Sequence, residues 1–361
     1  MIRNLWGRLV APIDPTLMTI LGLLVAYAML VLVSASSERV TSQLLNLAVA
    51  LVVMRVAAQI PPQRLMHLAL PLYVGGLLLL IAVALFGDIS KGARRWLNLG
   101  FMRIQPSEIM KIAMPLMLAW YFQKRESLLR WREFAFAALL LAAPVGLIAR
   151  QPDLGTAILV LAVGFYVIFL AGISWKVLAT LAVGALASLP VLWSLLHGYQ
   201  RSRILTLLDP EQDPLGKGFH IIQSTIAVGS GGVLGKGWGH GTQTHLEFLP
   251  ERHTDFIFAV LSEEFGLIGN VVLLCLYALL IARGLMIAGN APTVFSRLLA
   301  GSITLIFFTY AFVNMGMVSG ILPVVGVPLP FVSYGGTALV TLFLGVGILM
   351  SIHRHRMLVQ K

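Results

Sequence analysis

The sequence predicts an all-α polytopic membrane protein with ten transmembrane helices and a large extracytoplasmic loop between the seventh and eighth helices. Two observations carry this prediction. Hydrophobic residues make up 58% of the 361 residues and charged residues 11%, whereas a soluble domain contains roughly 25% charged residues. The apolar residues also gather into ten runs, each close to the span of about 20 residues that crosses a bilayer.

The ten apolar runs are joined by short linkers, apart from two longer segments at 88–104 and 197–254. The runs cover 16–35, 43–60, 67–87, 105–122, 134–149, 154–171, 176–196, 255–282, 297–318 and 333–352. No small-residue cleavage site follows the first run, which predicts a retained helix rather than a signal peptide. We find no internal repeat, so residues 1–361 are expected to form one membrane domain, with 197–254 as its outer loop.

The distribution of Lys and Arg predicts the orientation, because short cytoplasmic loops of membrane proteins are rich in these residues. With the N-terminus inside, 14 of the 26 Lys and Arg residues lie on the cytoplasmic side, and the short outer loops hold only Arg39 and Arg150. Both termini are therefore expected in the cytoplasm. The same bias explains the net charge of +11 without a nucleic-acid partner. The single cysteine, Cys275, excludes a disulfide framework and a thiol metal site.

The other cations lie in or just after the two long outer segments. They are Lys91, Arg94, Arg95, Arg103 and Lys111 in the first, and Arg201, Arg203, Lys217, Lys236 and Arg252 in the second. This placement runs against the usual bias. Either long loops escape the rule, or an anionic ligand binds at the outer face.

An acidic residue stands at the mouth of the eighth span, within the stretch FLPERHTDFIFAVLSEEFGLIG at Phe248–Gly269. A charged loop ends at Asp255, and an apolar run begins at once with Phe256. A carboxylate at this place is costly unless something uses it. It is either a helix cap, with Thr254 or Asp255 accepting the first free N–H groups, or a functional group.

The first outer segment, KGARRWLNLGFMRIQPSEIMK, leads into the fourth span. Pro106 suits the first turn of a helix. Glu108 and Lys111 are then three residues apart on one helix face, just inside the membrane. Charges in lipid are usually paired, so the pair is either a structural ion pair or, with Arg94 or Arg95, part of a phosphate site.

The second outer segment contains two further features. Arg201 and Arg203 resemble a phosphate- or headgroup-binding edge. The stretch GSGGVLGKG is similar to a P-loop, but that motif needs Gly at position 230 and Ser or Thr at 237. Because the chain has Ser230 and Gly237, we reject a nucleotide site there. His240, His245 and His253 show no diagnostic metal-binding spacing.

Two stretches carry no chemistry of their own but predict local structure. Ile221–Val228 is expected to form a short amphipathic helix at the interface. Asn314–Ala338 reads NMGMVSGILPVVGVPLPFVSYGGTA, with four Gly and three Pro within 320–336 and no charge. Irregular backbone this apolar is tolerated only when it packs within protein or lines a cavity. We therefore expect it to form a wall of an outer vestibule.

The motifs together closely resemble the SEDS family, named for shape, elongation, division and sporulation. The resemblance rests on Asn314, Gly320, Pro323, Gly326, Pro328, Phe331, Ser333, Tyr334, Gly335 and Gly336, and on the blocks GARRWLNLG, QPSEIMK, QPDLGTA, GSGGVLGKG, FLPERHTDF and EEFGLIG, in order. It covers the whole chain. The compact ends and the loop are more similar to the RodA-type, elongation members than to the FtsW-type members.

The resemblance implies ten transmembrane helices in the bacterial cytoplasmic membrane and peptidoglycan glycosyltransferase activity, polymerising lipid II for cell elongation and rod shape. It implies a class B penicillin-binding protein as partner. It places Asp255 at the essential acidic position and Glu108 and Lys111 at paired positions. We expect the diphosphate ligands among Arg94, Arg95, Lys111, Arg201 and Arg203. Trp96 is an interfacial anchor or a sugar-stacking surface.

The residues suit this chemistry. A lipid diphosphate leaving group is anionic, so cations matter more than a general acid, while the attacking hydroxyl needs a base, here Asp255. A retaining mechanism would need two carboxylates about 5 Å apart, whereas Glu263 lies about 12 Å further along a helix. No cofactor is required, although a divalent cation, Mg²⁺ or Mn²⁺, at the diphosphate is an alternative.

Two rival functions remain at this stage. A lipid II flippase would bind the same anionic lipid, but a transporter places its polar site near the bilayer midplane, often between inverted repeats. The polar residues here cluster at one face, which favours an enzyme. A non-catalytic scaffold of the elongation complex would not need Asp255 at a helix mouth.

Overall fold

A computed structural model describes residues 13–90, 93–98, 103–126, 130–151, 153–195, 198–212, 217–246, 249 and 251–359. Each of the ten predicted spans contains a helix: α2 (Pro15–Ala35), α3 (Val40–Ala57), α4 (Pro62–Phe86), α5 (Pro106–Lys124), α6 (Trp131–Arg150), α7 (Leu154–Leu170), α8 (Trp175–Leu195), α12 (Ile257–Gly289), α13 (Val294–Val318) and α14 (Gly336–Val359). The predicted helical, multi-pass fold class is therefore confirmed.

By length and composition, 7 helices of the described part can cross a membrane. They are α2, α3 with the short 3-10 helix η1 (Ser37–Arg39) before it, α4, α6, α12, α13 and α14. The helix α7 and most of α8 are apolar but shorter. A total of ten spans, which also includes α5, stays a prediction.

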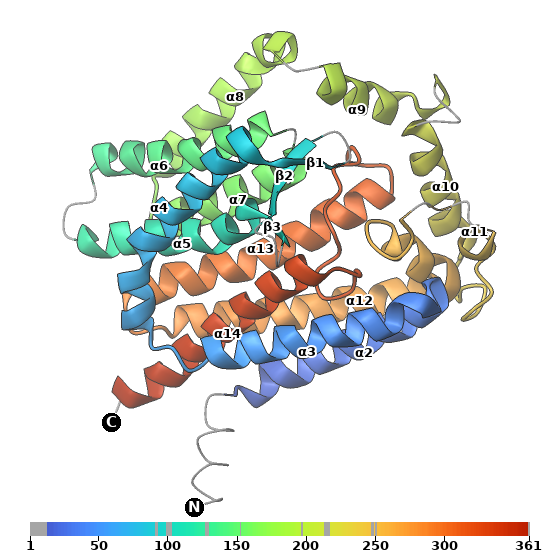
Figure 1. Ribbon diagram of the computed structural model, residues 1–361, viewed down its shortest axis with the longest axis horizontal. Helices are drawn as coiled ribbons and strands as arrows, with labels where there is room; N and C mark the ends of the chain where they lie inside the picture. Colours follow the sequence, from blue (N-terminus) through green and yellow to red (C-terminus); the bar gives the residue numbers. More distant parts are fainter. Residues whose placement is uncertain are drawn as a thin grey trace, which may run out of the picture.

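Helix α13 forms the centre of the bundle and contacts α5, α7, α12 and α14. Within its most apolar window, 78% of the residues are buried. Small residues allow this close packing: a Cβ added at Gly284 would lie 2.3 Å from the Thr304 hydroxyl oxygen. Figure 1 shows α2 and α3 along one side of the bundle and α4 to α7 on the other, with α13 between them.

The first outer segment contains a small antiparallel sheet, where we expected only a loop. Its strands are β1 (Asp88–Ser90), β2 (Ala93–Asn98) and β3 (Arg103–Ile104), in the order β1-β2-β3. The cations and the tryptophan of this segment therefore lie on a strand, whose side chains alternate between two faces.

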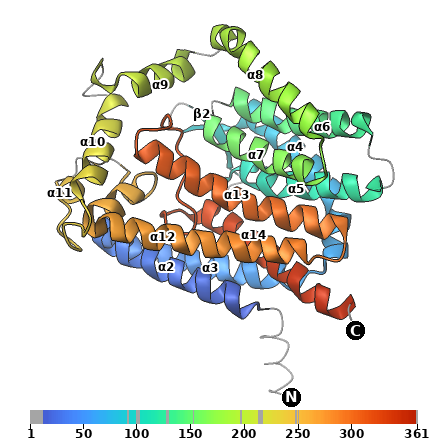
Figure 2. The same ribbon diagram turned by 180° about the vertical axis from the view of Figure 1, so that it is seen from behind.

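The second outer segment is largely helical. It contains α9 (Gly198–Leu208), the short 3-10 helix η3 (Pro210–Gln212), α10 (Lys217–Ser230) and α11 (Thr242–His245). The helix predicted at Ile221–Val228 is confirmed within the longer α10. Figures 1 and 2 show α8 leading away from the bundle, and α9 and α10 returning to the N-terminal end of α12, against which α10 packs.

Helix α12 is broken at Gly266, which has φ 63° and ψ −156°, a conformation open essentially to glycine alone. The segment GSGGVLGKG satisfies the interrupted backbone. The amides of Lys236 and Gly237 donate to the carbonyls of Glu263 and Glu264, both at 3.0 Å. On the other side of the break, the amides of Leu267 and Ile268 donate to Gly232 and Val233, at 2.9 and 3.2 Å. This segment therefore hydrogen-bonds the backbone on both sides of the helix break, and it is not a nucleotide site.

Candidate active site at the mouth of α12

Asp255 lies in the turn that leads into α12, so its place at a helix mouth is as predicted. The helix begins at Ile257, and its N-cap residue is Phe256, which makes no side-chain capping bond. Neither Thr254 nor Asp255 therefore occupies the N-cap position, and the interpretation of Asp255 as the N-cap residue is wrong. Its side chain is partly accessible.

Asn314 in α13 connects this turn to the loop between α13 and α14, at Val327. Its side-chain amide donates to the carbonyl of Asp255 at 2.9 Å and to the carbonyl of Val327 at 2.7 Å. Asn314 is completely buried in α13. Because the bonds go to main-chain oxygens, they hold the backbone at position 255 whatever side chain is attached there.

The two preceding residues are held by the loop between α13 and α14. The Ser333 hydroxyl donates to the carbonyl of Thr254 at 2.6 Å, and the amide of Tyr334 donates to the carbonyl of His253 at 2.8 Å. Three consecutive carbonyls, 253 to 255, are thus fixed from one side. Three hydrogen bonds therefore fix the main chain of this turn.

The same loop places Gly326 next to the Asp255 carboxylate. Gly326 has φ +73°, and a Cβ added there would lie 3.5 Å from Asp255 Oδ2. The loop also abuts the start of α7, where a Cβ on Gly155 would lie 2.7 Å from the carbonyl oxygen of Val325. This apolar, irregular backbone packs within protein, as expected, and lies beside Asp255. The outer vestibule stays a prediction.

Glu108 and Lys111 form the predicted ion pair, with 2.6 Å between Lys111 Nζ and Glu108 Oε1. The lysine side chain is only 5% exposed, and its ammonium also donates to the Tyr310 hydroxyl at 2.5 Å. Tyr310 lies one helical turn before Asn314 on α13. Helix α13 therefore joins the ion pair to the backbone of Asp255.

Arg95 lies close to the start of α7, with its Nε 3.9 Å from Asp153 Oδ2. Asp153 also caps α7 through the Thr156 amide at 3.2 Å. Arg94 and Trp96, which alternate with Arg95 along β2, lie on the opposite face of the strand. The structure thus places Arg95 near α7 and α5, but leaves Arg94 exposed.

Arg201 and Arg203 lie on α9, apart from this group. The guanidinium of Arg201 donates to the carbonyls of Trp193 and Ser194, at 3.0 and 2.6 Å, and so binds the end of α8. Helix α9 packs chiefly against α10 and η3. Of the five cations expected to bind the diphosphate, the structure therefore brings Arg95 and Lys111 close to α5 and α7, and places Arg201 and Arg203 elsewhere.

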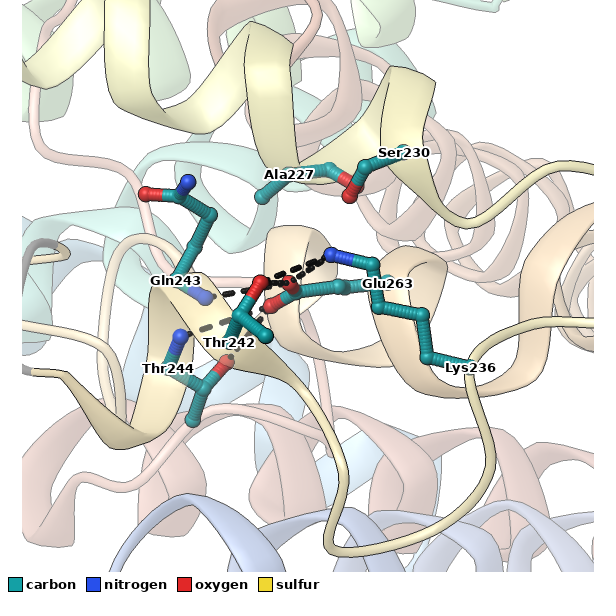
Figure 3. A network of polar contacts seen from close by, with 7 residues as sticks. All are labelled: Ala227, Ser230, Lys236, Thr242, Gln243, Thr244 and Glu263. Atoms are coloured by element: carbon teal, nitrogen blue, oxygen red, sulfur yellow. Dashed lines mark hydrogen bonds and ion pairs between the residues drawn. The ribbon is translucent and has the colours of Figure 1, made fainter.

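Glu263 is the buried carboxylate whose role the sequence did not reveal. It is 0% exposed and accepts bonds from the Lys236 ammonium at 2.7 Å and the Thr242 hydroxyl at 3.0 Å (Figure 3). The amides of Gln243 and Thr244 add bonds at 3.0 and 3.3 Å. The run TQTH, which directly follows the Gly-rich stretch ending at Gly241, is the signal in the sequence. Glu263 holds the outer loop onto α12 and has no capacity left for a substrate.

No group of three or more His, Cys, Asp or Glu side chains is placed to hold a metal ion anywhere in the described ranges. A divalent cation at Asp255 would therefore need oxygen ligands from a bound diphosphate, which Mg²⁺ commonly uses. The Mg²⁺ or Mn²⁺ alternative stays a prediction.

The fold and this geometry define a multi-pass helical membrane protein with a carboxylate at a helix mouth and a buried ion pair that α13 connects to that turn. The family model of the FtsW/RodA/SpoVE cell cycle proteins matches residues 10–358. The chain belongs to this family, and the resemblance of its motifs to the SEDS proteins is confirmed.

Sequence comparison with curated relatives supports the same family. The chain is 55% identical over 363 residues to the peptidoglycan glycosyltransferase MrdB of Escherichia coli K12, covering 99% of this chain and 98% of MrdB. It is 39% identical to a probable peptidoglycan glycosyltransferase FtsW of Geobacter metallireducens, over 83% and 80% of the two chains.

Two solved structures share the fold over 95% of this chain. A chain of a peptidoglycan synthase complex, studied for the coordination of polymerization and crosslinking, matches with a TM-score of 0.82, 36% identity and 98% of its own length. The Thermus thermophilus rod shape determining protein RodA matches with a TM-score of 0.72, 32% identity and 97% of its length.

Proposed function

We propose that this chain polymerises lipid II into glycan strands at the outer face of the bacterial cytoplasmic membrane, with Asp255 as its general base. The chain is a peptidoglycan glycosyltransferase of the FtsW/RodA/SpoVE family. The observation that carries the assignment of Asp255 is its rigid turn, held through the carbonyls of residues 253 to 255. The fixed main chain places one partly accessible carboxylate at the mouth of α12.

The reaction is a single displacement. The oxygen of an acceptor sugar hydroxyl forms a bond to the anomeric carbon of the donor, the bond from that carbon to the diphosphate oxygen breaks, and Asp255 takes the hydroxyl proton. The leaving diphosphate keeps the electron pair, so nearby cations stabilise it. Our candidates for this role are Lys111, which α13 connects to the turn of Asp255, and Arg95, which lies near the start of α7. Glu263 is committed to Lys236 and Thr242, so it does not supply the second carboxylate of a retaining route.

Purified protein in detergent or liposomes should convert lipid II into glycan polymer, with a class B penicillin-binding protein present or absent. Polymer formation would separate this function from both rivals: a flippase would move lipid II without joining it, and a scaffold would leave it unchanged. The names of the relatives and the polar cluster at one end of the bundle favour the enzyme. Absence of polymer under all these conditions would contradict the proposal.

The orientation is part of the same proposal, because an outer active site needs the 197–254 loop outside. Single cysteines introduced at Gly239 and Val359, after replacement of Cys275, should be labelled by a membrane-impermeant thiol reagent from opposite sides. The inner position should react only after permeabilisation. Labelling of both positions from the same side would contradict cytoplasmic termini and an outer site.

The partner is expected to dock on α12 and α13, which lie side by side in Figure 2. The predicted face spans Val271–Leu285 and Leu298–Val313. Most of α13 is buried, so the part of it available for docking is the pair of exposed, stacked rings of Phe308 and Phe312, whose centroids lie 5.7 Å apart. A class B penicillin-binding protein is the expected partner, since the structural relative belongs to a peptidoglycan synthase complex that coordinates polymerization and crosslinking.

The double variant Phe308→Ala/Phe312→Ala should lower co-purification of the penicillin-binding protein several-fold, because truncating aromatic anchors typically costs about 1–2 kcal/mol each. The matched control is Leu181→Ala/Leu186→Ala, two exposed apolar residues on α8. Equal co-purification by both double variants and the wild type would contradict this face.

A further inference from the structure

A polar cavity of about 430 Å³ lies at the outer end of α2. Its volume falls within the range of about 300–1,000 Å³ typical of small-molecule sites. Besides Val33, Ala35 and Gly239, its walls contain hydroxyl, carboxylate, guanidinium and indole groups, from Ser34, Ser36, Ser37, Glu38, Trp238 and Arg252. A flat ring surrounded by hydroxyl and charged groups matches a saccharide, which has apolar C–H faces and a rim of hydroxyl groups.

Trp238 is held in place before a ligand binds. Its indole N–H donates to the carbonyl of Leu30 at 2.9 Å, while 51% of the residue remains exposed. The two residues before it, Lys236 and Gly237, donate their amides to the carbonyls of Glu263 and Glu264, and the Lys236 ammonium binds the Glu263 carboxylate (Figure 3). An accessible ring with a fixed orientation is preorganised for stacking.

The cavity adjoins the candidate active site. Arg252, on its wall, lies three residues before Asp255 and is fixed by a bond of 2.6 Å to the carbonyl of Thr244. Arg39, next to the wall residue Glu38, lies over the Tyr334 ring, with 5.5 Å between guanidinium carbon and ring centroid. Tyr334 in turn binds the carbonyl of His253. The cavity therefore shares Arg252 with the turn that carries Asp255.

We propose that the cavity around Trp238 is a saccharide subsite that holds part of the glycan strand next to Asp255, an inference that rests on the proposed polymerase function. An interfacial membrane anchor is the simpler role for an exposed tryptophan. That role explains neither the adjoining hydroxyl and charged groups nor the continuity with the turn of Asp255.

The test is binding of a soluble tetrasaccharide of alternating N-acetylglucosamine and N-acetylmuramic acid, without lipid or peptide, to the full chain in nanodiscs. Trp238→Ala should weaken this binding about 5- to 30-fold, as expected for loss of an aromatic anchor. The affinity of Trp238→Phe, which keeps a flat ring, should lie between that of the wild type and that of Trp238→Ala. The matched control is Trp131→Ala, because Trp131 is 72% exposed but lies at the start of α6, away from the cavity.

Binding by Trp238→Ala equal to that of the wild type, or no binding by the wild type, would overturn the subsite. Equal binding combined with poorer membrane insertion or poorer partner co-purification would assign Trp238 to an anchor or a protein contact instead. Because tetrasaccharide binding needs no turnover, inactive Asp255→Asn protein should bind it normally. The two hypotheses therefore fail separately: undiminished binding by Trp238→Ala removes the subsite alone, and polymerisation by Asp255→Asn removes the catalytic assignment alone.

Discussion

Asp255→Asn protein is expected to fold, to insert into the membrane and to bind its partner, yet to polymerise lipid II about 10²- to 10⁴-fold more slowly than the wild type, the usual effect of losing a general base. The substitution keeps the size of the side chain and removes its charge. Three bonds hold this turn through the main-chain carbonyls of residues 253 to 255, and the substitution leaves those carbonyls unchanged. The polymerisation rate should therefore fall while the stability of the fold stays close to that of the wild type.

The matched control is Glu251→Gln, which removes a carboxylate of the same turn, from an exposed side chain. Initial rates of glycan formation and thermal unfolding in detergent would be measured for both variants and the wild type. Glu251→Gln should polymerise near the wild-type rate. A well-folded Asp255→Asn protein with a normal rate would show that Asp255 is not the base.

Lys111→Met is expected to destabilise the protein by about 3–5 kcal/mol, because it leaves the carboxylate of Glu108 buried without its cation. The ammonium is almost fully buried and binds both Glu108 and Tyr310. The double variant Glu108→Gln/Lys111→Met should recover most of this stability, since replacing both members of a buried pair with neutral groups is often nearly neutral. Thermal unfolding of the two variants would measure the difference.

The double variant also separates a structural ion pair from a substrate-binding one. If Lys111 stabilises the leaving diphosphate, the restored protein should remain folded and use lipid II poorly. Polymerisation at the wild-type rate by the stable double variant would assign the pair to structure alone. A double variant as unstable as Lys111→Met would contradict the burial argument.

Local properties of the sequence determined where the helices lie along the chain and which residues stand at their N-terminal ends. The apolar run predicted at 176–196 is helix α8, Trp175–Leu195, because burial of apolar side chains in a bilayer is decided segment by segment. The pairing of Glu108 with Lys111 followed from their spacing on one helix, and the place of Asp255 followed from the abrupt start of an apolar run. Neither inference needed a distant residue.

The tertiary structure alone decided which partner each polar group has. GSGGVLGKG gave no hint that its amides and carbonyls would close a break at Gly266, some thirty residues later in the chain. Arg201 is like the other outer cations in sequence, yet it binds the carbonyls at the end of α8. The bonds from Asn314 to Asp255 and Val327 likewise join three separate segments. Every residue carries a main-chain carbonyl, so the sequence cannot mark which one accepts a distant side chain, and only the packing of the helices makes that choice.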